Sequence, residues 1–325
     1  MRAIVIKQYG GPDVLNIEER PDPLPRAGHV LIEVKAFGVN RAETHMREGT
    51  WPEAAEISGI ECAGIVKADP DGRLIPGQKV VAFMGGMGRK INGSYAELTN
   101  VPASNVVAVE TKLAWEHLAA IPESYATAWA TLFGNLDLES GQTVVIRGAT
   151  SALGRAAVEI AAHAGAHVIA STRNPDRGAS LKELGAEEVL LEDPDLPRRV
   201  RDLHPHGADA VLELVGNSTV VSSLTMVRRH GRLCLAGFLG GTQPITDFMP
   251  MAELPSGVHF SFFGSFMFGT PGFPTSEIPM QLIVDRVERG IYKAKAARIL
   301  PFEEIREAHR LMEANTANGK IVVRV

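Results

Sequence analysis

Cysteine is scarce in this chain of 325 residues, which contains only Cys62 and Cys234. The two stand far apart, each inside an apolar run, so neither a disulfide framework nor a four-cysteine metal loop can be built from them. This scarcity indicates a reducing environment. We therefore expect a cytoplasmic protein without a cysteine-based metal site.

Long apolar runs, a strong excess of one charge and a nucleophile elbow are missing as well. No apolar stretch approaches the roughly eighteen residues of a membrane helix, and the chain opens on the strand-like RAIVI without a signal-peptide pattern. The 33 basic and 38 acidic residues give a net charge of −5, without the basic clusters that bind nucleic acid. No G-x-S-x-G motif is present, which argues against serine hydrolysis. We expect neither a membrane nor nucleic acid as a partner.

The pattern of the sequence changes near residue 122. Before it, short alternating runs such as HVLIEVKAF and GQKVVAF indicate an antiparallel β domain. After it, strand-like runs recur at intervals that fit a strand plus a crossover helix, starting near Thr143, His167, Glu188, Asp209, Arg232 and Val258. Six such units predict an α/β fold with a doubly wound parallel sheet. The closing segments RILPF, EEIREAHRLMEAN and KIVVRV indicate a return to the first domain.

The segment VVIRGATSALGRAA lacks G-x-G-x-x-G but keeps two glycines six residues apart, Gly148 and Gly154. If TVVIR is the first strand of the sheet, this loop lies at its carboxyl end, where a helix begins near Ala152. The free N–H groups and the dipole of a helix start favour a pyrophosphate. An ordinary strand-to-helix turn is the alternative, and the six βα units favour nucleotide binding. The expected loop residues are Gly148, Thr150, Ser151, Ala152, Leu153 and Gly154.

The choice of nicotinamide cofactor should be made about 20 residues beyond the loop, where an acid would bind a free ribose 2′-hydroxyl. The second strand ends there as HVIASTRNPDR, with Ser171, Arg173 and Arg177 and no acid on the strand itself. A guanidinium matches a phosphate in charge and in fork geometry. The residues therefore predict NADPH over NADH. Arg173 as plain surface and Asp176 as a displaced acid are the alternatives.

Several segments together resemble one family of oxidoreductases. They are MRAIVIKQYGGPDVLNIEERPDP, GVNRAETHMREGTWPE, SGIECAGIV, NGSYAEL, IPESYATAW, RGATSALGRAA, GRLCLAG and GKIVVRV. In this order and spacing the chain resembles, over essentially its whole length, the zinc-independent quinone oxidoreductase (zeta-crystallin-like) branch of the medium-chain dehydrogenase/reductase superfamily. The resemblance implies a GroES-like catalytic domain (residues 1–121 plus 264–325), an inserted six-stranded Rossmann domain that binds NADPH (residues 122–263), and a homodimer.

The resemblance also implies that zinc is missing. Asn40, Ile60 and Glu123 stand at the positions where zinc alcohol dehydrogenases of the superfamily carry cysteine, histidine and cysteine. Tetrahedral zinc prefers thiolate or imidazole donors. Without that Lewis acid, hydride delivery from NADPH to an electrophilic acceptor, a quinone or an α,β-unsaturated carbonyl, is the expected reaction. The aromatic run SFFGSFMFG either faces a cleft for a small apolar substrate or forms the edge strand that pairs two subunits.

Asn40 and His45 are the expected catalytic residues. Asn40 would donate its amide to the acceptor oxygen or to the cofactor, and a turn-forming asparagine is the alternative. His45 and Trp51 stand where several family members carry tyrosines beside the nicotinamide. His45 would protonate the reduced product. Solvent as the proton donor, with His45 a simple surface residue, is the alternative.

Further cofactor contacts follow only from the match to the family. They are Tyr125, Thr127, Asn217, Ala236, Gly237, Phe238, Leu239, Phe263, Gly264 and Ser265. For the phenylalanines, core packing is the alternative to contact. Glu192 stands where some relatives place a tyrosine that contacts the adenosine. An NADPH-dependent reductase is the leading hypothesis, and a protein that binds NADPH with little or no turnover is its rival.

Overall fold

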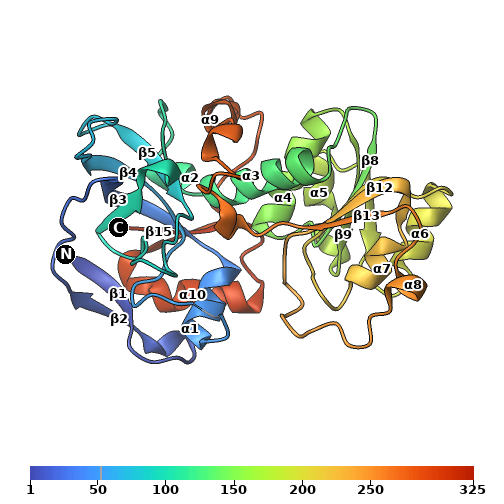
Figure 1. Cartoon of the computed structure of the whole chain (residues 1–325), viewed down its shortest axis with the longest axis horizontal. Helices are drawn as coiled ribbons and strands as arrows, with labels where there is room; N and C mark the ends of the chain where they lie inside the picture. The colour runs from blue at the N-terminus through green and yellow to red at the C-terminus, as the bar shows by residue number, and fades with distance from the viewer. Residues whose placement is uncertain (52) are drawn as a thin grey trace. The chain divides into compact units, whose positions relative to one another are not determined.

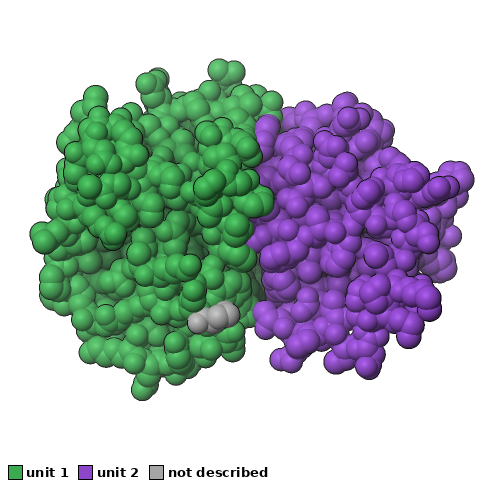
Figure 2. All heavy atoms as spheres, viewed as in Figure 1, with its two compact units in different colours: residues 1–126, 265–325 green, residues 127–264 purple. Residues whose placement is uncertain are grey.

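The structure is a computed structural model that describes residues 1–51 and 53–325. The chain forms two compact units, which Figure 2 colours separately. Unit 1 comprises Met1–Ala126 with Ser265–Val325, and unit 2 comprises Thr127–Gly264. The domain boundaries predicted from the sequence, at 121/122 and 263/264, describe domains rather than compact units. They stay a prediction.

Unit 2 is built around a six-stranded parallel sheet in the order β10-β9-β8-β11-β12-β13 (Figure 1). The strands are β8 (Thr143–Arg147), β9 (His167–Thr172), β10 (Glu188–Leu191), β11 (Ala208–Glu213), β12 (Val227–Leu235) and β13 (His259–Phe262). The helices are α4 (Ala152–His163), α5 (Gly178–Glu183), α6 (Leu196–Leu203), α7 (Val220–Leu224) and α8 (Pro250–Glu253). The predicted doubly wound sheet is confirmed, and its order reverses between β8 and β11. Ligands of such sheets bind outside the carboxyl ends of the strands at this reversal.

The strand starts read from the sequence agree with the sheet to within one residue, except for β12. It begins at Val227 rather than near Arg232. Its pairing with β11 shifts between Ala208 and Ala210, and His230 has a φ of 65°. The regular pairing starts where Ala210 faces Arg232. The sequence pattern therefore located the regular part of β12 and missed an irregular lead-in.

Unit 1 contains a seven-stranded sheet in the order β14-β15-β3-β4-β5-β7, with β6 also paired to β3, and a separate two-stranded sheet. The strands are β1 (Arg2–Ile6), β2 (Leu15–Glu19), β3 (His29–Val39), β4 (Glu61–Ala68), β5 (Lys79–Phe83), β6 (Leu98–Pro102), β7 (Val106–Ala108), β14 (Arg298–Pro301) and β15 (Ile321–Arg324). The helices are α1 (Arg41–Glu48), α2 (Trp115–Leu118), α9 (Met280–Glu288) and α10 (Ile305–Ala314), while α3 (Pro122–Trp129) begins in unit 1 and ends in unit 2.

The predicted antiparallel β domain made from both ends of the chain is confirmed, with one parallel pair inside it. β14 and β15 run parallel because α10 connects them as a crossover. β15 also pairs antiparallel with β3, so it lies inside the sheet. Within residues 1–51 and 53–325, no helix is long and apolar enough to cross a membrane.

A buried polar group ties α1 to α10 inside unit 1. His309 contacts the hydroxyl of Tyr95 through Nε2 (3.0 Å), and Arg47 donates to its Nδ1 (3.1 Å). All three side chains are fully buried. Burial and the neighbouring guanidinium lower the pKa of His309 to about 3. The ring is therefore neutral in the folded protein at ordinary pH.

Candidate functional site

The glycine loop of unit 2 follows β8 and leads directly into α4, as the sequence predicts. Gly148 has a φ of 84°, a left-handed conformation that favours glycine. A Cβ at Gly154 would lie 2.5 Å from the carbonyl oxygen of Gly148, so only glycine lets α4 pack this closely on the turn. Ser151 caps α4 by accepting a hydrogen bond from the Gly154 amide (3.0 Å). The result is a compact turn at the start of a twelve-residue helix.

The open side of this loop is formed by the predicted residues that remain partly exposed. They are Gly148, Thr150, Ser151, Ala152 and Leu153. Helix starts leave backbone N–H groups without intrahelical partners, and these groups bind anions. The loop therefore has the geometry and the polarity that a pyrophosphate requires.

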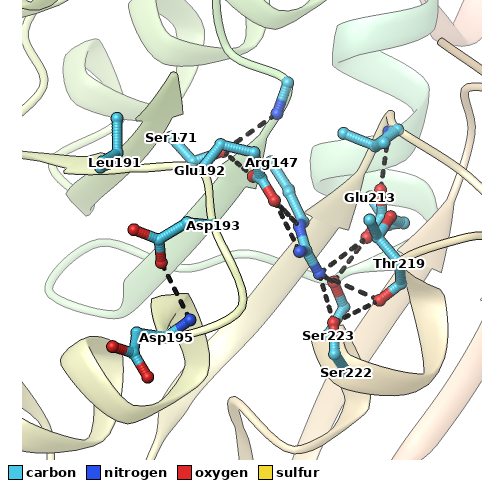
Figure 3. A network of polar contacts seen from close by, with 12 residues as sticks. Arg147, Ser171, Leu191, Glu192, Asp193, Asp195, Glu213, Thr219, Ser222 and Ser223 are labelled. Atoms are coloured by element: carbon cyan, nitrogen blue, oxygen red, sulfur yellow. Dashed lines mark hydrogen bonds and ion pairs between the residues drawn. The ribbon is translucent and has the colours of Figure 1, made fainter. Parts of the chain in front are cut away.

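A polar network, here called the edge network, joins the carboxyl ends of four neighbouring strands (Figure 3). Arg147, the last residue of β8, makes a two-pronged contact with Glu192 at 2.6–3.1 Å, through Nε and one terminal nitrogen. Its other terminal nitrogen donates to the hydroxyls of Ser222 (2.7 Å) and Ser223 (2.9 Å). Glu192 in turn accepts a hydrogen bond from the hydroxyl of Ser171 at the end of β9 (2.7 Å).

Glu213, the last residue of β11, completes the edge network. Its carboxylate lies 3.8 Å from Arg147, accepts from the Ser223 hydroxyl and also accepts from the amides of Val215 (2.6 Å) and Gly216 (2.9 Å). Burial raises its pKa, and the hydrogen bonds and Arg147 oppose that rise. One guanidinium thus serves two carboxylates at the edge where the strand order reverses.

Of the three residues predicted to select the cofactor, Ser171 is buried, whereas Arg173 and Arg177 are at least partly exposed. Ser171 is buried, and its hydroxyl is engaged with Glu192 and with the amide of Gly148 (3.2 Å). Arg173 is exposed, and Arg177 lies half-buried in a short turn, Pro175–Arg177, that leads into α5. Ser171 therefore connects the glycine loop to Glu192, while the two arginines lie beyond the end of β9. Their contact with a cofactor stays a prediction.

The other predicted cofactor contacts of unit 2 follow β11, β12 and β13, except for Thr127, which lies on α3. Asn217 donates to the carbonyl of Gln243 (2.8 Å). Ala236, Gly237, Phe238 and Leu239 continue from β12 and remain partly exposed. Thr127 and Phe263 are buried, and Gly264 is partly exposed. In unit 1, Tyr125 is buried and packs its ring against Tyr292, and Ser265 is half-buried.

Asn40 lies in a buried cluster of unit 1, here called the lysine cluster, with Glu43, Glu61 and Lys320. The Asn40 amide group donates to Glu61 (2.9 Å) and more weakly to Glu43 (3.3 Å), and its oxygen accepts from Lys320. Lys320 also forms an ion pair with Glu61 and donates to the Ser124 hydroxyl (3.3 Å). Glu43, Glu61 and Lys320 are buried.

The positions compared with the zinc ligands converge on the lysine cluster. The backbone amide of Ile60 donates to Glu43 (3.2 Å), and that of Glu123 donates to Glu61 (2.8 Å). Asn40 caps α1, and its own amide donates to Glu43 (2.7 Å). Burial raises the pKa of Glu43 to about 8 against the opposing effect of Lys320. Among residues 1–51 and 53–325, no group of three or more His, Cys, Asp or Glu side chains is arranged to hold a metal ion.

His45, the second predicted catalytic residue, lies on α1 in an aromatic cluster of unit 1. Its ring stacks near Trp51 at 6.4 Å between centroids. Arg89 lies over Trp51 (5.5 Å) and over Phe266 (4.8 Å). Burial lowers the pKa of His45, and the buried nitrogens His45 Nε2, Trp51 Nε1 and Arg89 Nε have no hydrogen-bond partner.

Sequence reasoning missed Arg147, Glu213, Glu43, Glu61 and Lys320. The signal for the first two was a charged residue closing an otherwise apolar strand, in TVVIR and in ADAVLE. A charge at the carboxyl end of a parallel strand faces the ligand edge. Lys320 gave no such signal because Asn40 and Glu61, with which it pairs, lie more than two hundred positions earlier in the chain.

Comparisons with known proteins agree with this arrangement. A family model described as "Alcohol dehydrogenase GroES-like domain" matches residues 26–111, and one described as "Zinc-binding dehydrogenase" matches residues 152–281. The quinone oxidoreductase of Homo sapiens is 28% identical over an alignment of 336 residues, covering 99% of this chain and 97% of that protein.

Two solved structures align with 100% of this chain and over 100% of their own length. A mycobacterial protein solved as a complex with NADPH has a TM-score of 0.88 and 27% identity. An NAD-dependent alcohol dehydrogenase has a TM-score of 0.84 and 28% identity. The two sheets, the glycine loop and these matches lead to one assignment: the chain belongs to the medium-chain dehydrogenase/reductase superfamily of oxidoreductases, in its quinone oxidoreductase branch.

Proposed function

We propose that this chain is an NADPH-dependent oxidoreductase that transfers hydride to a quinone or an α,β-unsaturated carbonyl, and that it does so without zinc. One observation supports the proposal above all: in the lysine cluster, the ammonium group of Lys320 donates a hydrogen bond to the side-chain oxygen of Asn40 and forms an ion pair with Glu61. A reaction at this site must therefore use an acceptor that is already electrophilic, because no Lewis acid activates it.

The residues of the lysine cluster do not fit zinc. Of the three compared positions, Ile60 offers no donor, and the oxygen of Asn40 is engaged by Lys320. Glu123 offers a carboxylate, but zinc prefers to combine carboxylates with imidazole or thiolate ligands. A buried ammonium among these groups would also repel a dication. The zinc binding in the description of the matching family model is therefore not supported by the residues of this site.

The glycine loop of unit 2 does fit a dinucleotide. The turn at Gly148 and the close approach at Gly154 leave the start of α4 free to bind a pyrophosphate. Arg173 and Arg177 offer cations for a 2′-phosphate, and the likeness to a mycobacterial protein complexed with NADPH supports the same cofactor. Bound there, the reduced nicotinamide supplies the hydride.

Asn40 would orient the acceptor in this reaction. Lys320 and Glu61 fix the amide plane from both sides, so one amide hydrogen stays with Glu61. The other hydrogen makes only the longer 3.3 Å contact with Glu43, and an acceptor oxygen can replace it. A donor fixed before the reaction stabilises the negative charge that develops on that oxygen.

The aromatic cluster of unit 1 favours a flat, electron-poor acceptor. Arg89 packs between Trp51 and Phe266, which holds both rings and the guanidinium in place. The unpartnered nitrogens of Trp51, Arg89 and His45 offer hydrogen-bonding groups beside these apolar faces. A quinone combines a flat ring with carbonyl acceptors, and it meets both requirements.

Oxidation of NADPH by the purified protein, followed by absorbance against a panel of quinones, enals and enones, tests the proposal. We expect turnover with at least one acceptor class, unchanged by a chelator and without stoichiometric zinc in the protein. Stoichiometric zinc together with loss of activity on chelation would contradict the metal-free reaction. NADPH binding without acceptor-dependent oxidation would instead favour a binding protein without turnover. In that case the Asn40 amide hydrogens would stay with Glu61 and Glu43.

A further inference from the structure

A carboxylate reaches the end of β9 from the neighbouring strand rather than from β9 itself. β9 and β10 run parallel with Thr172 opposite Leu191, so the residues after them lie side by side. The amide of Glu192 donates to the carbonyl of Thr172 (2.9 Å), and its carboxylate accepts from the Ser171 hydroxyl (2.7 Å). The second strand of this sheet therefore does have an acid at its carboxyl end (Figure 3).

Dinucleotide-binding sheets use an acid at this place to bind the free ribose 2′-hydroxyl of NAD. A carboxylate also repels a 2′-phosphate, which carries up to two negative charges. The side chain of Glu192 is 11% exposed, so it is close to the surface on which a ligand would lie. Its charge is thus opposed to that of Arg173, which is exposed just beyond β9.

The neighbouring charges leave Glu192 only partly neutralised. Arg147 contacts it but also lies 3.8 Å from Glu213, so one cation is shared between two carboxylates. The next acid, Asp193, is paired with Arg199. Glu192 is therefore a carboxylate in direct hydrogen-bond contact with the end of β9.

We propose that Glu192 is a specificity-determining residue of the dinucleotide site, where its carboxylate limits the preference for a 2′-phosphorylated cofactor. This inference rests on the proposed function, because it requires that the loop at Gly148 binds a dinucleotide. Selectivity for NADPH is then the balance between Arg173 and Arg177 on one side and Glu192 on the other. The similarity of the chain both to a protein complexed with NADPH and to an NAD-dependent dehydrogenase agrees with such a balance.

Two nucleotides that differ only in the 2′-phosphate test this balance without any hydride chemistry. The dissociation constants of adenosine 2′,5′-bisphosphate and adenosine 5′-monophosphate are measured by calorimetry for the wild type and for E192Q. Glutamine keeps an acceptor for Arg147 and a polar contact for Ser171. We expect E192Q to raise the preference for the bisphosphate about tenfold, because one opposing charge is removed.

Four further variants separate the effect of charge from the effects of side-chain shape and of folding. E192D keeps the charge and should leave the preference within about twofold of the wild type, whereas E192A removes the charge and should raise it as E192Q does. E188Q makes the same change of charge at the opposite end of β10, about 13 Å away along the strand, and should change nothing. R173Q should lower the preference.

The outcomes separate a failure of the proposed function from a failure of this inference alone. If the wild type binds neither nucleotide, the proposed function is overturned, and this inference with it. If the wild type binds both while E192Q and E192A leave the preference unchanged or lower it, the inference alone is wrong. An equal rise in E192D and E192Q would show that shape rather than charge decides.

Discussion

Each unit of this protein holds a buried cation that pairs with a carboxylate, but the two cations differ in kind. In the edge network of unit 2, Arg147 reaches Glu192 and Glu213 with a planar fork. In the lysine cluster of unit 1, Lys320 contacts Glu61 as a point charge and shares its remaining hydrogens with Asn40 and Ser124. An arginine fork fixes the direction of its partners, whereas an ammonium leaves them adjustable.

This difference matches what each region has to do. The edge network connects the ends of β8, β9, β10 and β11, so its geometry supports the shape of the glycine loop. The lysine cluster surrounds one amide that would have to exchange a hydrogen bond for a substrate. A rigid network suits the support of the loop. The long 3.3 Å contact between Asn40 and Glu43 suits the exchange of a hydrogen bond.

Removing the arginine fork should have the largest effect. Arg147→Met leaves the buried Glu213 and the partly buried Glu192 without their cation, and we expect the free energy of unfolding to fall by about 3–5 kcal/mol. Arg147→Lys should recover only part of this loss, because an ammonium cannot make the two-pronged contact. Denaturant unfolding measures both variants. Arg232→Met, which removes an exposed ion pair with Asp137, is the control and should cost at most about 1 kcal/mol.

Removing the lysine should cost less than removing the arginine, because Lys320 is the cation of a single ion pair. We expect Lys320→Met to lower the free energy of unfolding by about 3 kcal/mol, since Glu61 is left charged and buried. The double variant E61Q/K320M should regain more than half of this loss. A double variant no more stable than K320M would mean that Glu61 is not the group left uncompensated.

A third buried cation, Arg47, donates to the imidazole of His309 inside unit 1. Because His309 titrates, this contact makes stability depend on pH. The pKa of His309 is about 3 in the folded protein and ordinary in the unfolded chain. The unfolded state therefore binds more protons below the ordinary value, and stability is lost as pH falls from about 6.5 toward 3. For this group the loss between pH 6.5 and 5 should be about 2 kcal/mol.

Unfolding of the wild type and of His309→Asn at these two pH values measures that contribution. Asparagine keeps an acceptor for Arg47 but does not titrate, so the variant should be less stable at neutral pH and lose about 2 kcal/mol less on acidification. His206→Asn, an exposed histidine between α6 and β11, is the matched control. Parallel pH profiles for the wild type and H309N would contradict the neutral, buried imidazole.

Replacing His45 should change turnover and leave stability nearly unaffected. His45→Phe keeps an aromatic ring beside Trp51 and removes the nitrogens, and we expect kcat to fall about tenfold if His45 transfers the proton to the product. Steady-state kinetics with the best acceptor of the panel measures this. An unchanged kcat would assign the proton to solvent and leave the lysine cluster as the catalytic part of unit 1.

The sequence predicted the sheet of unit 2 well because each strand is a short apolar run followed by a turn and a helical segment. It also located the glycine loop, since Gly148 and Gly154 are required by local geometry. Local patterns failed where a contact depends on the register between strands. Nothing in HVIASTR reveals that Glu192 of the next strand meets Ser171.

The candidate site in unit 1 was predicted only in part for the same reason. Asn40 was found through the family resemblance, and its position as the cap of α1 was not. The two buried glutamates were not recognised as partners, because burial of a charge depends on what surrounds it in three dimensions. Lys320 stands just before the apolar strand β15, where a lysine is usually solvent-exposed.

The internal position of β15 has a consequence for how the protein is made. On the ribosome, β3, β4 and Glu61 emerge early, and β15, which pairs with β3, is synthesised more than two hundred residues later. At about 5–20 residues per second, Glu61 waits on the order of tens of seconds for Lys320. During that interval the early part of unit 1 carries an open strand edge and an unmatched acid, so we expect nascent chains stopped before residue 320 to be the ones that chaperones retain.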